Sequence, residues 1–178
     1  VNTNFGKGNV PPWFNEGLAE YYSTFAIEDD QKAKLGLPLE RHLNMLNQNK
    51  LIPLSTLFRI SGSQLHETAD HSRSIFYSES WALIHYLIAN GKADALNKFL
   101  TALFQGTAPD AAFQQAFQIP YSQLESELRR YVQQNSYRYS AITFKQKLVF
   151  DTEMSVAPLS EAESNAYLGD LLYHTNRW

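Results

Sequence analysis

The sequence predicts a mainly α-helical protein, and three observations support this fold class. Apolar residues recur at helical spacing in one segment after another, the connections between these segments are short, and a single stretch has strand-like content. The chain has 178 residues, of which 44% are hydrophobic, so it can bury a core of its own. One compact domain is therefore the default organisation.

The first predicted helix runs over about residues 12–25 and begins at a Pro-Pro pair. Proline suits the first helical position, because its φ is already fixed and its missing N–H has no partner to lose there. Apolar residues follow at i, i+4, i+7 and i+11, namely Phe14, Leu18, Tyr21 and Phe25. This spacing predicts one apolar stripe along the helix.

A glycine lies inside this helix, between two glutamates. Glycine costs about 1 kcal/mol relative to alanine at such a position, so Gly17 predicts that another backbone approaches closely there. Glu16 and Glu20 are four residues apart and share a face roughly opposite the apolar stripe. Such a pair is either two solvated glutamates or a metal ligand with a supporting neighbour, and Gly17 favours the second interpretation.

More helices are predicted along the chain, separated by short polar segments. Their expected ranges are 38–49, 75–90, 93–105 and 109–117, with a short helical turn over 53–60 and a further helix after Ser122. The helix over 75–90 has the broadest apolar face and is expected to be the most buried. Segments 27–36 and 64–73 read as irregular and polar, and capping boxes are predicted at Thr107–Asp110 and Ser122–Glu125.

The last forty residues break this pattern and then return to it. Residues 139–150 predict one extended segment, either a connector or part of a small hairpin, and helix resumes over 159–178. The run Ala166–Tyr173 followed by Asn176–Trp178 resembles the first helix and turn of a tetratricopeptide repeat. A complete repeat needs about 34 residues and stacked neighbours. A plain C-terminal amphipathic helix is the alternative.

The opening helix carries a more specific resemblance. Its run Pro12-Trp13-Phe14-Asn15-Glu16-Gly17-Leu18-Ala19-Glu20-Tyr21 resembles the gluzincin zinc metallopeptidases, and more narrowly their aminopeptidase-like and peptidase MA-like branch. The resemblance implies the helical C-terminal subdomain of a peptidase catalytic domain. It also implies that Glu16 is the third zinc ligand, that Glu20 hydrogen-bonds a zinc-binding His, and that Asn15 supports the ligand beside it.

The same family uses a tyrosine as donor to the oxyanion of the tetrahedral intermediate. Tyr77 lies 61 residues after Glu16, and the segment Phe76–Leu83 resembles the corresponding family segment. The resemblance therefore implies the oxyanion role for Tyr77. On composition alone, with 10 tyrosines in the chain, Tyr77 is instead a core or interface residue.

One departure from the family pattern is large. The family needs a His-Glu-x-x-His helix shortly before the glutamate ligand, supplying two zinc ligands and the general base, and no His precedes Glu16 here. We therefore expect the sequence to be the C-terminal part of a peptidase domain, inactive and without tight zinc binding by itself. The alternatives are a non-catalytic relative that acts as a scaffold, and an unrelated helical interaction module.

The five histidines do not complete a zinc site from within the sequence. His66 and His71 are at i and i+5, about 140° apart on a helix, whereas the metal motif needs i and i+4. His85, on the most buried predicted helix, is expected to be a hydrogen-bonded core residue. His42 and His174 are expected at the surface of amphipathic helices.

Composition limits the partners and divides the chain. A net charge of −3 without a long basic run argues against nucleic acid or an anionic membrane as the main partner. No apolar stretch is long enough to span a membrane. The absence of Cys excludes disulfides and thiol chemistry but does not identify a compartment. We expect a metallopeptidase-like helical part over 1–137, a connector over 138–157, and the start of a repeat over 158–178. A peptide or protein substrate and a protein partner for the repeats are the expected partners.

Overall fold

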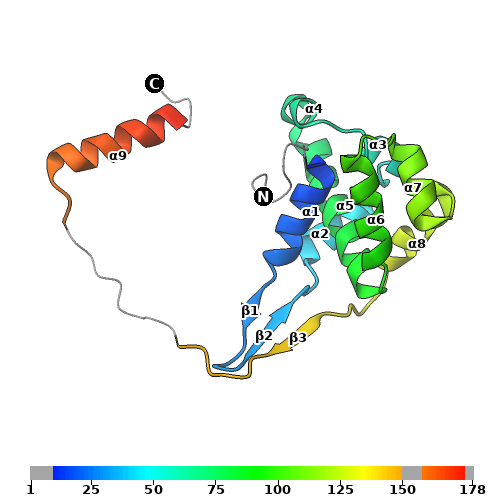
Figure 1. Cartoon of the computed structure of the whole chain (residues 1–178), viewed down its shortest axis with the longest axis horizontal. Helices are drawn as coiled ribbons and strands as arrows, with labels where there is room; N and C mark the ends of the chain where they lie inside the picture. Colours follow the sequence, from blue (N-terminus) through cyan, green and yellow to red (C-terminus); the bar gives the residue numbers. More distant parts are fainter. Residues whose placement is uncertain (1–9, 150–157, 175–178) are drawn as a thin grey trace. The chain divides into compact units, whose positions relative to one another are not determined.

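The computed structural model describes residues 10–149 and 158–174 (Figure 1). Residues up to Lys147 belong to one compact unit and those from Leu148 onwards to a second. The division falls inside the predicted connector 138–157. The predicted turn at Asn176–Trp178 concerns residues outside the described ranges.

The first unit is built mainly of α-helices, which confirms the predicted fold class (Figure 1). In chain order they are α1 (Pro12–Tyr22), α2 (Glu40–Gln48), α3 (Leu54–Leu57), α4 (Gly62–Glu67), α5 (Asp70–Ala89), α6 (Ala93–Phe104), α7 (Pro109–Phe117) and α8 (Tyr121–Val132).

Helix α5 forms the centre of this unit. It packs against α1, α2, α6 and α8, and its residues from Ser78 to Leu87 are all buried. Trp81, Leu83 and Ile84 have no exposed surface, as expected for a helix that is apolar on nearly every side. The prediction of a most buried helix is confirmed, although α5 begins at Asp70 and not near Ile75.

The contact between α1 and α5 depends on Gly17. A Cβ atom at this position would lie 2.4 Å from the carbonyl oxygen of Ser80 and 2.8 Å from Cγ1 of Ile84. The two helices therefore touch through their backbones, as the sequence predicted. Phe14 and Tyr21 of the apolar stripe are buried, whereas Phe25 lies beyond the end of α1 and is exposed.

A three-stranded antiparallel sheet extends from the helices (Figure 1). Its order is β1 (Ala26–Ile27), β2 (Lys32–Leu35), β3 (Ser140–Thr143), with Ala33 opposite Ile142. The extended segment predicted over 139–150 is confirmed only at its start, where β3 covers Ser140–Thr143. The expectation that 27–36 is irregular was wrong, because β2 lies within this segment. Its two lysines alternate with Ala33 and Leu35, and its backbone hydrogen bonds form only with β1 and β3.

Helix starts also differ from the predictions. Segment 64–73 is not a polar loop, because Ser61 and Gln64 form a reciprocal capping box that starts α4, and α5 begins soon after. Neither of the two predicted capping boxes forms. The residues preceding α7 and α8 are Ala108 and Pro120, and neither helix has a side-chain cap.

The second unit contains α9 (Glu161–His174), which covers most of the predicted C-terminal helix. Large apolar side chains on it are exposed, among them Tyr167 and Leu168. Among the helices of the described ranges, none is both long and apolar enough to cross a membrane.

Candidate functional site

The two glutamates of α1 lie next to the start of the buried part of α5. Glu16 is partly buried, and its Oε1 accepts a hydrogen bond from Nδ2 of Asn15 at 3.2 Å. Within the described ranges, Glu16 takes part in no ion pair. Its carboxylate therefore keeps most of its acceptor capacity for a cation.

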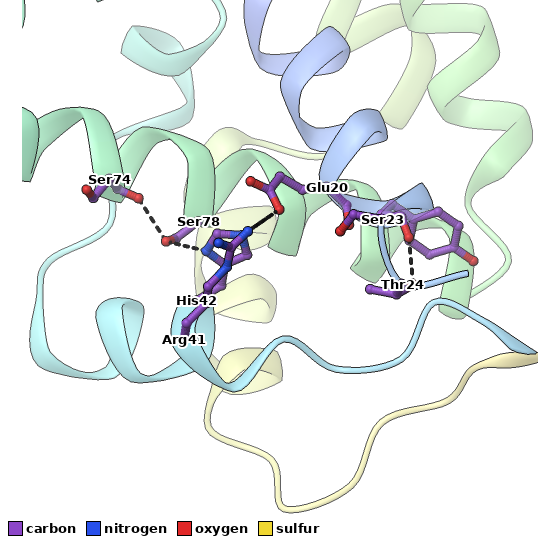
Figure 2. Close-up of polar contacts among 8 residues, drawn as sticks. Glu20, Ser23, Thr24, Arg41, His42, Ser74 and Ser78 are labelled. Atoms are coloured by element: carbon purple, nitrogen blue, oxygen red, sulfur yellow. Dashed lines mark hydrogen bonds and ion pairs between the residues drawn. The ribbon is translucent and has the colours of Figure 1, made fainter. Parts of the chain in front are cut away.

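Glu20, one helical turn later, is held by two consecutive residues of α2 (Figure 2). Its Oε2 lies 2.6 Å from Nη2 of Arg41 and 3.2 Å from Nε2 of His42. The contact with His42 has ion-pair distance but not hydrogen-bond geometry, because the buried Nε2 has no hydrogen-bond partner. Proximity, rather than a directed hydrogen bond, thus describes this pair.

His42 is buried, so the prediction that it lies on the surface was wrong. Its side chain is only 7% exposed and packs on the ring of Trp81 at a centroid distance of 5.5 Å. Burial lowers the pKa of the His42 imidazole, and nearby Glu20 opposes that shift. The sequence could not indicate this burial, because α2 alone is a polar helix, and His42 becomes buried only when α1 and α5 pack against it.

Tyr77 lies close enough to both glutamates to be influenced by their charges. Burial raises the pKa of the Tyr77 phenol most, and the negative charges of Glu16 and Glu20 raise it further, while Arg73 lowers it. Tyr77 and Glu20 also line one cavity of about 240 Å³, together with Arg41, His42 and residues Met45, Ser74 and Ser78. The structure therefore brings together the residues that the sequence singled out on α1 and α5.

Larger hollows occur elsewhere in the unit but lack such a group of side chains. One of about 420 Å³ has a single charged residue in its lining, Arg59, which is engaged with Asp110. Another of about 480 Å³ is lined by Glu125 and two arginines. Neither contains a histidine, so the smaller cavity beside Tyr77 offers the more varied chemistry.

Two other histidines, His85 and His71, are each engaged with residues outside this group. His85 donates or accepts at both ring nitrogens, with Nδ1 2.6 Å from the Tyr131 hydroxyl and Nε2 2.8 Å from the carbonyl oxygen of Gly36, which confirms a satisfied core residue. Nε2 of His71 lies 3.1 Å from Oδ1 of Asn49 on the surface. In the part of the chain that the structure describes, no three His, Cys, Asp or Glu residues are grouped to hold a metal.

Compared with known proteins, the chain matches no protein-family model, no curated protein and no solved structure.

Proposed function

We propose that this chain belongs to the catalytic domain of a gluzincin-type zinc metallopeptidase that hydrolyses peptide bonds. Glu16 is the third zinc ligand, and Tyr77 is the donor to the oxyanion. One observation carries the proposal. Tyr77, 61 residues after Glu16, lines one cavity with Glu20, and Glu16 precedes Glu20 by one turn of the same helix, so that both carboxylates act on the phenol.

The carboxylate of Glu16 fits the ligand role. It is partly buried, it accepts one hydrogen bond from Asn15, and in the described ranges no cation neutralises it. Zinc accepts carboxylate oxygens beside imidazoles. When bound, zinc polarises the substrate carbonyl and lowers the pKa of a water molecule. The proposal assigns the two imidazole ligands and the general base to residues outside this sequence.

The environment of Tyr77 suits a hydrogen-bond donor. A donor to an oxyanion must keep its proton until the negative charge develops. Burial and the two glutamates raise the pKa of the phenol above its usual value, so Tyr77 is neutral at physiological pH. Its position on the wall of the cavity that Glu20 also lines is open to a substrate.

The proposal is tested with Glu16→Gln in the full-length protein. We expect the variant to lose zinc affinity and peptidase activity, because an amide oxygen is a far weaker zinc ligand than a carboxylate. Tyr77→Phe should keep the zinc affinity and lower kcat by about 10²–10³, which is typical for loss of one oxyanion donor. Glu40→Gln, at an exposed position of α2, is the matched control and should change neither property.

Zinc affinity is measured by competition with a chelator, and activity on a peptide library. If Glu16→Gln binds zinc as tightly as the native protein, the peptidase proposal is wrong and the scaffold alternative gains support. The 178-residue chain alone should bind zinc only weakly, because a single carboxylate is not a metal site.

A further inference from the structure

The side chain of Glu20 is fixed at one of its two oxygens only. Arg41 and His42 both approach Oε2, at 2.6 and 3.2 Å. Among the described residues, none forms a hydrogen bond or ion pair with Oε1. The carboxylate is therefore oriented from α2 while its second oxygen stays available.

The two contacts of Glu20 differ in stiffness. The Arg41 side chain is 67% exposed, and an exposed ion pair of this kind does little to hold a side chain in place. The His42 side chain is 7% exposed and is packed on Trp81, so it cannot move without disturbing the core. The imidazole is the rigid half of this attachment.

A second element fixes the orientation of the imidazole. Ser78 Oγ lies 2.8 Å from the carbonyl oxygen of Ser74 and 2.9 Å from Nδ1 of His42 (Figure 2). A carboxylate oxygen can only accept, so the contact between Glu20 Oε2 and Nε2 of His42 is attractive only when Nε2 carries a proton. In neutral His42 Nδ1 is then unprotonated and accepts from Ser78 Oγ, which fixes the orientation of the ring.

We propose that His42 is a positioning residue of the candidate zinc site, which Ser78 orients and which holds Glu20 Oε2 so that Oε1 is presented to a metal-binding imidazole. The last part of this inference rests on the proposed function, whereas the arrangement of His42, Glu20 and Ser78 does not. Packing alone would not explain His42, since an apolar side chain would fill the same space without leaving a buried nitrogen lacking a hydrogen bond.

The arrangement is tested first in the 178-residue chain by NMR of ¹⁵N-labelled histidine. Neutral His42 should have the resonances of the tautomer protonated at Nε2. Glu20→Gln should lower the pKa of His42, because the carboxylate of Glu20 favours the imidazolium while Arg41 and burial disfavour it. A tautomer protonated at Nδ1, or an unchanged pKa in Glu20→Gln, would overturn the proposal.

The role in the site is tested in the full-length protein with two substitutions of His42. His42→Gln can place an amide near Nε2 and keep a contact with Glu20, whereas His42→Asn reaches only toward Ser78. We expect His42→Asn to lose about 10–100-fold in zinc affinity or kcat/KM, as when a partner of a metal ligand is removed, and His42→Gln to recover most of that loss. His71→Asn, at an exposed histidine, is the matched control.

The outcomes separate the two proposals. If Glu16→Gln abolishes zinc binding while His42→Asn leaves zinc affinity and activity intact, the positioning role is wrong and the peptidase assignment stands. If Glu16→Gln has no effect, the peptidase assignment fails, and the NMR measurements alone decide whether His42 holds Glu20. If His42→Asn does not fold, folded His42→Gln is compared with folded Arg41→Ala instead. An equal loss of zinc affinity and kcat/KM in these two variants would contradict a specific role of the imidazole.

Discussion

Gly17→Ala is the most direct test of how the candidate site is assembled. Gly17 lies in α1 between the two glutamates and directly over the backbone of α5. The Cβ of an alanine would lie 2.4 Å from Ser80 O and 2.7 Å from Ser80 C, whereas ordinary contact begins at 3.4 Å. Because these are backbone atoms of a buried helix, no side chain can rotate away, and α1 must move outward by about 1 Å.

The net effect on stability follows from two opposing contributions. Alanine gains about 1 kcal/mol in helix propensity. Overpacking a core contact typically costs about 1–3 kcal/mol, and a clash between two backbones belongs at the upper end of that range. We therefore expect a net loss of about 2 kcal/mol in the free energy of unfolding, with Glu16 and Glu20 displaced from Tyr77.

Urea unfolding measures the loss, and NMR titration of Tyr77 measures the displacement. The phenol pKa should fall in Gly17→Ala, because the carboxylates that raise it move away. Gly62→Ala is the control, since nothing lies within 4 Å of its Cβ position, and it should change stability by about 0.5 kcal/mol or less. A Gly17→Ala protein as stable as the native one would refute the close packing of α1 on α5.

Three further predictions concern buried and capping groups. Burial raises the pKa of Glu79 from 4.5 to about 8, so between these pH values the folded protein binds one more proton than the unfolded chain. The free energy of unfolding therefore falls as pH rises, by about 1.4 kcal/mol per pH unit. The same measurement on Glu79→Gln, from about pH 5 to pH 8, should lack this slope. Burial lowers the pKa of His85 below 6.5, so below about pH 6.5 the unfolded imidazole binds a proton that the folded one does not. In the Glu79→Gln background, stability should therefore fall as pH drops through this range, which acid unfolding monitored by circular dichroism checks. Ser61→Ala should destabilise α4 by about 1 kcal/mol in hydrogen exchange, because it removes a formed cap, whereas Ser122→Ala should change α8 by about 0.5 kcal/mol or less, because no cap forms there.

Local patterns predicted much of the helical framework. The apolar stripe and the Pro-Pro start located α1, and the broad apolar face identified α5 as the most buried helix. Gly17 predicted a close backbone contact, because a glycine inside a helix needs a steric reason. These features are readable because they depend on residues a few positions apart.

Features that depend on distant partners were missed or misplaced. The two residues of β1 and the mixed sequence of β2 carry no strand signal alone, and their pairing is completed by β3 more than a hundred residues later. The capping boxes predicted at Thr107–Asp110 and Ser122–Glu125 did not form, because the prolines near both helix starts set the backbone entry.

The sequence by itself determined that the chain is mainly helical, and it singled out Glu16, Glu20 and Tyr77 through a resemblance that remains a proposal. Tertiary structure alone decided that α1 and α5 bring these residues together and that α2 adds His42 to them. The physical reason is that the burial, the pKa and the ion pairs of these side chains depend on contacts between helices. A polar helix such as α2 reveals the environment of its histidine only once α1 and α5 have closed around it.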